Sequence, residues 1–200
     1  MTFANNITKD EINLLPLLEY EGEAILIETD QGCIRALGEL TKEKVLGFDT
    51  ETRPSFSKGQ YFKVAILQLS GPKRAYLFRL NKIKFTDELA ALLADPEILK
   101  VGVAVHDDVK ALQKLHSFEP GGFIDLNTVA EKNGIENLGL RSLTAIFLHL
   151  RLSKGAKLTN WDNDDLTRPQ VEYAALDALV GLQIYNKMVD HKFNISIWKP

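Results

Sequence analysis

The stretch VLGFDTET, residues 45–52, constrains the fold of this 200-residue chain more than any other feature. Its apolar first half is typical of a buried strand, and side-chain alternation along a strand puts Gly47, Asp49 and Glu51 on one face. A carboxylate that is buried without a partner is costly, so a pair on a packed face requires a compensating group. The alternative is a frayed, solvated strand end, and the spacing alone leaves both interpretations open.

The remaining pattern predicts a single α/β domain with a mixed sheet flanked by helices. Three closely spaced strands at 45–52, 62–70 and 74–80 predict an antiparallel meander. After them, helices and strands alternate. The other expected strands are 23–29, 98–105 and a short edge strand at 123–126, and the expected helices are 30–43, 85–96, 107–118, further helices from 126 onward, and a long one at about 168–189.

Two helix starts carry capping boxes, in which a hydroxyl and a carboxyl or amide side chain three residues later satisfy free backbone amides. Thr8 and Glu11 form the first, and Pro16 limits the helix that follows to a turn or two. Thr167 and Gln170 form the second, with Pro169 in the first turn, where a missing amide proton is tolerated.

Composition places few limits on function. A hydrophobic content of 45% and a charged content of 26% are typical of a globular chain. We find no bilayer-spanning run and no signal peptide, and therefore expect a cytoplasmic protein without membrane association. The single cysteine, Cys33, excludes an internal disulfide, and no Cys or His is spaced to form a zinc site with it. A net charge of −3 gives no basic footprint, but it does not exclude a nuclease with an acidic metal site.

A second group of polar residues follows the apolar stretch at 98–105, where His106, Asp107 and Asp108 precede a helix. Aspartate is a common cap at a helix start, so we expect one of the two aspartates to cap and the other to be available for chemistry. For His106, a structural role is favoured over metal ligation.

Asp177 is the most unusual acidic residue, because it lies in the apolar helical stretch EYAALDALVGLQIY at 172–185. Such a residue lowers helix propensity and needs a buried partner. Tyr173 lies four residues earlier and on the same helix face. In a purely structural alternative, Asp177 accepts a hydrogen bond from a core tyrosine or a buried amide, and both interpretations stay open.

Taken together, carboxylates from a strand, a helix start and a helix middle predict an all-oxygen site for hard divalent ions, Mg²⁺ or Mn²⁺. Two such ions would stabilise the attacking and leaving oxygens of a phosphoryl displacement, and a nearby tyrosine hydroxyl would orient the water. We find no nucleophilic Ser or Cys arrangement and no glycine-rich phosphate loop.

These residues resemble the three exonuclease motifs of the DEDD 3′-5′ exonucleases. The matching segments are FDTE at 48–51, Val101-Gly102 with Asp108 and Leu112, and YAALD at 173–177. The tyrosine is similar to that of the branch that includes ribonuclease D and polymerase proofreading domains. KVAILQL and LTNWDNDDLTRPQVEYAALDA resemble the exonuclease domain of the Werner syndrome helicase.

The resemblance implies an RNase H-like fold in a domain at 23–200, with residues 1–22 as an extension packed on it. It implies metal-dependent hydrolysis of DNA or RNA from a free 3′ end, which releases 5′-mononucleotides. By the same resemblance, Asp49, Glu51 and Asp177 would hold the first metal, Asp49 and Asp108 the second, and Tyr173 would position the attacking hydroxide.

Asp108 is preferred over Asp107 for that role because the family motif has a large apolar residue four positions later, which Leu112 supplies. Thr50, Lys157 and Trp161 are candidate nucleic-acid contacts, although a packed indole is the favoured interpretation of Trp161. No obligate protein partner is expected. The rival hypotheses are a catalytically silent nucleic-acid-binding module of the same fold and an RNase H-type endonuclease.

Overall fold

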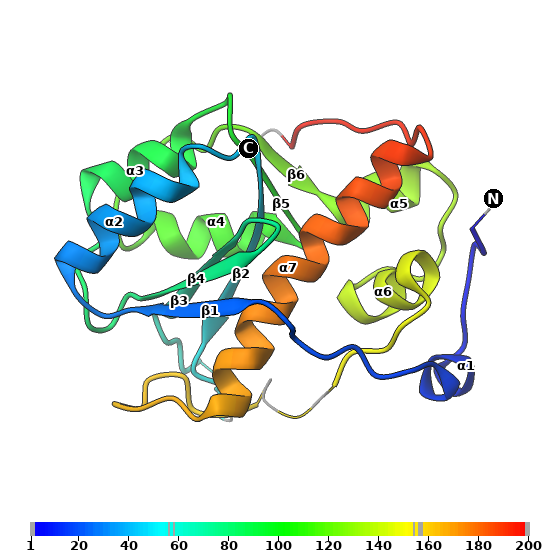
Figure 1. Cartoon of the computed structure of the whole chain (residues 1–200), viewed down its shortest axis with the longest axis horizontal. Helices are drawn as coiled ribbons and strands as arrows, with labels where there is room; N and C mark the ends of the chain where they lie inside the picture. The colour runs from blue at the N-terminus through cyan, green and yellow to red at the C-terminus, as the bar shows by residue number, and fades with distance from the viewer. Residues whose placement is uncertain (1–2, 56, 58, 154, 156–157, 199–200) are drawn as a thin grey trace.

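The computed structural model describes residues 3–55, 57, 59–153, 155 and 158–198, and within them a six-stranded mixed sheet carries helices on both faces (Figure 1). Strands β2, β3 and β4 are antiparallel, β1 runs parallel to β4, and β5 and β6 run parallel to β2. The mixed sheet predicted from the sequence is thus confirmed. In sheet order the strands are β1 (Glu23–Ile27), β4 (Arg74–Arg79), β3 (Val64–Ser70), β2 (Val45–Thr52), β5 (Leu99–Gly102) and β6 (Phe123–Asp125).

The helices divide between the two faces of the sheet. Those at 30–40, 87–94 and 105–113 share an apolar core with Leu46 and Phe48, on one face. The last three helices share a second core with Val101, on the other face. The helices are α1 (Lys9–Leu14), α2 (Asp30–Leu40), α3 (Asp87–Ala94), α4 (Val105–Gln113), α5 (Leu126–Lys132), α6 (Leu140–Leu148) and α7 (Arg168–Asp190).

Local sequence signals account for most of these elements. Both predicted capping boxes are present, at Thr8 with Glu11 and at Thr167 with Gln170. The predicted meander is confirmed for β2, β3 and β4. The strand predicted at 23–29 ends at residue 27, because Thr29 caps α2. β1 does not extend the meander but pairs with β4 on its far side.

The connection between β5 and α4 differs from the sequence prediction. The strand expected over residues 98–105 ends at Gly102, and Ala104 takes a left-handed conformation with φ of 58° before α4 begins. Asp107 and Asp108 lie in the first turn of α4, and the expectation that one of them caps it is wrong. Instead, the carboxylate of Asp125 accepts a hydrogen bond of 3.0 Å from the amide of Val105.

Helix α7 lies close against β2 because both contact surfaces lack bulk. A Cβ atom at Gly47 would lie 1.9 Å from the carbonyl oxygen of Ala178, so only glycine permits this approach. Ala174 and Ala175 also face the sheet and are fully buried. The helix, orange in Figure 1, therefore crosses the sheet at a depth that sets the Asp177 side chain near the end of β2.

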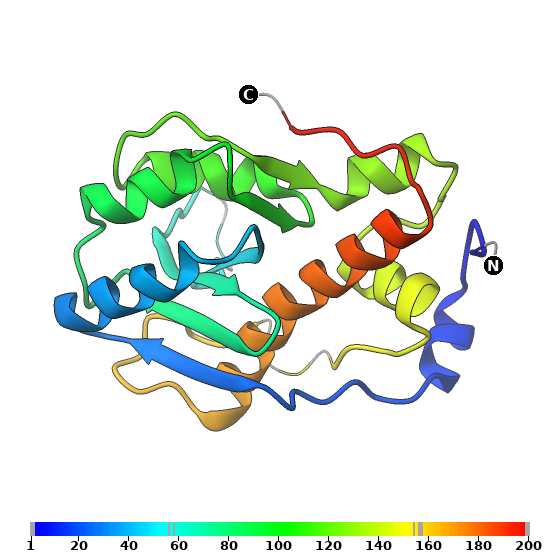
Figure 2. The ribbon, with the colours of Figure 1, turned by 45° about the horizontal axis from the view of Figure 1, so that its top comes forward.

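The N-terminal segment packs against the last helices. In both views α1 lies beside α6 (Figure 1, Figure 2). The amide of Leu18 donates to the carbonyl of Arg151 over 2.9 Å, and the ring of Phe3 lies 4.5 Å from that of Phe147. Among the helices of the described residues, none combines the length and apolar character needed to cross a bilayer.

Candidate active site

A cleft of ≈ 680 Å³ lies where the end of β2, the turn before α4, the start of α6 and α7 meet. Strand alternation and helix periodicity bring acidic and phenolic groups to it from different elements. Four of the five residues predicted to be catalytic line it: Asp49, Glu51, Tyr173 and Asp177.

Asp49 is the electrostatic centre of the cleft. Burial raises the pKa of its carboxyl well above the ordinary value, and the charges of Asp177, Asp108 and Glu51 raise it further. A hydrogen bond of 2.9 Å from the amide of Thr50 opposes this. Asp49 makes no ion pair with any Lys, Arg or His that the structure describes. The frayed-end interpretation of Asp49 therefore does not hold.

The structure separates the two adjacent aspartates of α4. Asp107 is exposed and contacts the ring of His106 over 3.1 Å. Asp108 is partly buried and accepts a hydrogen bond of 2.5 Å from the hydroxyl of Thr50, at the end of β2. Burial raises the pKa of Asp108 to about 6 despite this hydrogen bond. Of the two, Asp108 is thus the one whose charge reaches Asp49.

Asp177 is 7% exposed, and the hydroxyl of Tyr173 lies close enough to interact with its carboxylate. The tyrosine partner that the structural alternative proposed is therefore present, but it lies inside the acidic cleft. Burial raises the pKa of Tyr173 far above its ordinary value, and the charges of Asp177 and Glu51 add to this. The tyrosine therefore keeps its proton and acts as a hydrogen-bond donor.

The donor set fits a hard divalent ion in its chemistry, because carboxylate oxygens from β2, α4 and α7 converge around Asp49. As the side chains stand, no three Asp, Glu, His or Cys groups among the described residues are close enough together to hold an ion. Like charges repel, so drawing the carboxylates into one coordination shell requires a cation between them. The shared coordination shell of Asp49, Glu51 and Asp177 stays a prediction.

The three predicted nucleic-acid contacts have different outcomes. Thr50 lines the cleft but bonds to Asp108. Trp161 is fully buried, with its ring 6.1 Å from that of Tyr173, so its prediction as a nucleic-acid contact is wrong and the packed interpretation is correct. Lys157 lies outside the described residues.

Two buried polar residues of this region were not singled out from the sequence. Asp125, at the end of β6, caps both α4 and α5 through its carboxylate. Its position between a predicted strand and a helix start could have predicted this capping role from the sequence. Gln68 pairs with Asp49 across β3 and β2, is fully buried, and its side-chain amide has no hydrogen-bond partner among the described residues. A glutamine within an apolar strand was its signal.

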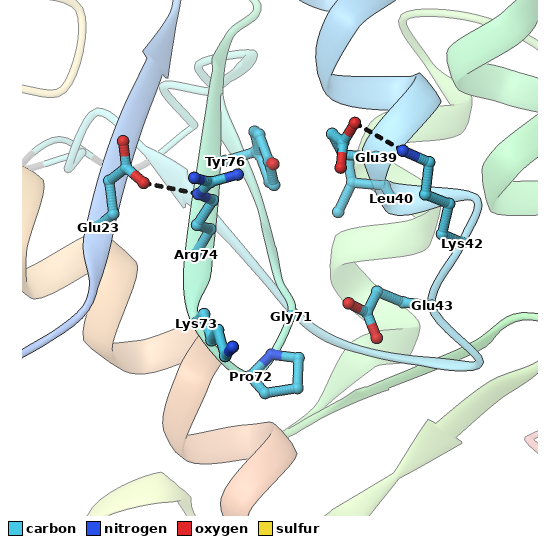
Figure 3. A pocket seen from close by; sticks show the side chains of 10 residues that line it. All are labelled: Glu23, Glu39, Leu40, Lys42, Glu43, Gly71, Pro72, Lys73, Arg74 and Tyr76. Carbon is cyan, nitrogen blue, oxygen red and sulfur yellow. Dashed lines mark hydrogen bonds and ion pairs between the residues drawn. The ribbon is translucent and has the colours of Figure 1, made fainter.

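A second concave surface, of ≈ 570 Å³, lies between α2 and the turn joining β3 to β4 (Figure 3). Four of its charged groups form two ion pairs. Glu23 contacts Arg74 over 2.6 Å, and Glu39 contacts Lys42 over 2.7 Å, all four being exposed. We call this surface the paired groove, and these four paired charges show none of the burial seen in the acidic cleft.

Comparison with known proteins places the chain in one family. Residues 24–191 match the 3′-5′ exonuclease family. The chain belongs to this family. It is 32% identical over 185 residues to the mouse bifunctional 3′-5′ exonuclease/ATP-dependent helicase WRN, which covers 87% of this chain. It is 36% identical over 149 residues to exonuclease 3′-5′ domain-containing protein 2 of Drosophila melanogaster, which covers 72% of the chain.

Solved structures of exonuclease domains share the fold. The Aedes aegypti Nibbler EXO domain superposes with a TM-score of 0.77 at 22% identity, covering 89% of this chain and 94% of its own. Escherichia coli RNase D superposes with a TM-score of 0.76 at 25% identity, covering 84% and 44%. The predicted RNase H-like fold is therefore confirmed.

This exonuclease-family chain spans only part of its curated relatives, 13% of the mouse protein and 25% of the fly protein. The family generally uses divalent metal ions, which agrees with the oxygen-rich donor set of the cleft. The identity and number of such ions for this chain belong to the proposal below.

Proposed function

We propose that this chain hydrolyses the terminal phosphodiester of DNA or RNA strands from the 3′ end, releases 5′-mononucleotides, and depends on two divalent ions, Mg²⁺ or Mn²⁺. The observation that carries this proposal is the environment of Asp49, whose carboxylate is enclosed by the charges of Asp177, Asp108 and Glu51. Such an arrangement destabilises the fold unless a cation binds there, so it is hard to explain as structural support.

The four carboxylates would hold the ions, which when bound neutralise the charge that develops on the attacking and leaving oxygens. Tyr173 has a separate role. Its hydroxyl keeps its proton and lies beside the carboxylate of Asp177, so it is placed to orient a water molecule beside these carboxylates. In the reaction a bond forms between the water oxygen and phosphorus, the bond from phosphorus to the 3′ oxygen breaks, and that oxygen takes up a proton.

The adjacent aspartates of α4 offer a matched test. Incubation with 3′-ended DNA and RNA oligonucleotides and Mn²⁺ or Mg²⁺ should yield mononucleotides, and a chelator should stop the reaction. Asp108→Asn should lower the rate by about 100-fold or more, since it removes a buried charge of the site. Asp107→Asn removes the neighbouring exposed charge and should have no effect. If no oligonucleotide is shortened under any metal, the proposed function is wrong.

The same experiment separates the rivals. Internal fragments would support an RNase H-type endonuclease. Strand binding with neither cleavage nor calorimetric Mn²⁺ binding would support a silent module. The match to the exonuclease family and the destabilising charge at Asp49 favour the enzyme. The cytoplasmic location, the lack of an obligate protein partner and the division of the chain at residue 23 remain parts of this proposal.

A further inference from the structure

Arg141 is a cation inside the acidic cleft. It lies in the first turn of α6, and together with Gly139 and Ser142 it lines the same cleft as Asp49 and Asp177. Among the cleft-lining residues that the structure describes, it is the one with a cationic side chain. A cation so near several carboxylates would ordinarily pair with one of them.

Arg141 makes no such pair. Within the described part of the chain its guanidinium forms no ion pair, and its Nε–H is buried without a hydrogen-bond acceptor. An unsatisfied buried donor of a charged group is costly. The guanidinium nitrogens lie more than 4.0 Å from the carboxylate oxygens of Asp49. A ligand that enters the cleft would supply the missing acceptor.

The backbone around Arg141 favours an anionic ligand. Gly139 begins α6 without a side-chain cap, and its own amide donates to Asn127 over 2.8 Å, which fixes the start of the helix. The positive end of the α6 dipole thus faces the cleft beside the guanidinium. Arginine pairs with phosphate through two parallel N–H bonds.

We propose that Arg141 binds the backbone phosphate that lies one nucleotide on the 5′ side of the scissile phosphodiester. This inference rests on the proposed function and specifies its substrate. The scissile phosphate belongs beside Asp49, Asp177 and Tyr173, and Arg141 lines the same cleft without pairing with those carboxylates. The guanidinium therefore contacts the next phosphate along the strand. The favoured substrate is a strand with at least two consecutive phosphodiesters at its 3′ end.

Binding without cleavage gives the first test. In an Asp49→Asn background, fluorescence anisotropy of a 5′-labelled single-stranded oligonucleotide is measured across a series of salt concentrations. Arg141→Ala should weaken binding by about 5- to 10-fold and reduce the slope of log K against log salt by about 0.7, the contribution of one single-strand phosphate contact. Arg74→Ala removes the same charge in the paired groove (Figure 3) and should change neither value. Equal weakening by both variants would overturn the inference.

Substrate chemistry gives the second test. A neutral methylphosphonate in place of the penultimate phosphodiester should lower kcat/KM of the wild type by about 10-fold, mainly through KM. The same substitution should have little further effect on Arg141→Ala, because the contact is already absent. Equal losses in both proteins would show that Arg141 does not contact this phosphate.

Two controls test whether a loss of binding reflects misfolding. The first is the thermal midpoint of each variant, and the second is the variant Arg141→Lys, which keeps the charge. The lysine variant should retain the salt slope while losing part of the affinity, since it cannot form the two-bond contact. A lysine variant that folds but behaves like Arg141→Ala in the salt series would overturn the proposal. If the wild type cleaves nothing, the proposed function fails, but the binding test still decides the role of Arg141.

Discussion

The acidic cleft and the paired groove are both lined by three carboxylates among the described residues, yet Asp49 of the cleft and the two paired glutamates of the groove are in opposite electrostatic states. In the groove, Glu23 and Glu39 are exposed and each contacts a cation. In the cleft, Asp49 is desolvated, surrounded by like charges and paired with no described cation. A balanced, solvated pair adds little to stability or function. A buried carboxylate among like charges indicates a site that a bound cation would complete.

The largest effect is expected for Asp49→Asn, which keeps the shape of the side chain and removes its charge. The rate of strand shortening should fall by about 10³-fold or more, because the central carboxylate is lost. The thermal midpoint without metal should rise, because a desolvated charge is removed. Exonuclease assays and thermal denaturation measure both. A variant that loses activity and stability together would contradict the idea that the cleft carries unbalanced charge.

The pH dependence of stability should also distinguish the cleft. The pKa of Asp108 is about 6 in the folded protein and near its ordinary value when unfolded, so the folded state binds more protons between these values. Stability without metal is therefore highest below about pH 4 for this group and falls as the pH rises through about 6, by roughly 2 to 3 kcal/mol.

Chemical denaturation at pH 4.5, 6 and 7.5 measures this effect. Asp108→Asn should flatten the dependence, whereas Asp107→Asn should not. Mn²⁺ should restore stability at pH 7.5, because it binds only the folded state. A wild-type protein whose stability rises over this range, with no difference in Asp108→Asn, would contradict the assignment.

Lys100 is a buried cation that can be compared with the buried carboxylate of Asp49. Its side chain is fully buried, but its ammonium group donates hydrogen bonds to the carbonyls of Leu92 and Asp95. Burial lowers its pKa to about 8, so the unfolded state binds more protons above that pH. Stability should therefore rise by roughly 2 kcal/mol between pH 8 and 9.5. Lys100→Met should lose this rise in denaturation experiments at both pH values. An identical pH slope in wild type and variant would rule out Lys100 as its source.

The smallest effect is expected in the paired groove. Glu23→Gln breaks the contact with Arg74, but both side chains are more than half exposed. Solvent therefore replaces the lost contact, and neither the unfolding midpoint nor the exonuclease rate should change measurably. A clear loss of activity would mean that the groove takes part in function, and the distinction between the two surfaces would fail.

The sequence by itself determined the elements and most of the candidate site. Short-range signals, such as the hydroxyls of Thr8 and Thr167, fix helix starts because their partners lie within three residues. The sequence likewise shows that Asp49 and Asp177 are charged residues within apolar stretches. Their resemblance to exonuclease motifs then predicted the family, and the comparisons with known proteins confirm it.

Only the tertiary structure decided the features that depend on contacts between distant segments. Ala104 ends β5 earlier than its apolar pattern predicts, and Asp125 caps α4 from 20 residues away. The burial of Trp161 and the placement of Asp108, rather than Asp107, beside Thr50 depend on how α4 and α7 pack on the sheet. Arg141 is an ordinary surface-type residue in sequence, because its buried Nε–H, without an acceptor among the described residues, arises only when α6 meets the cleft.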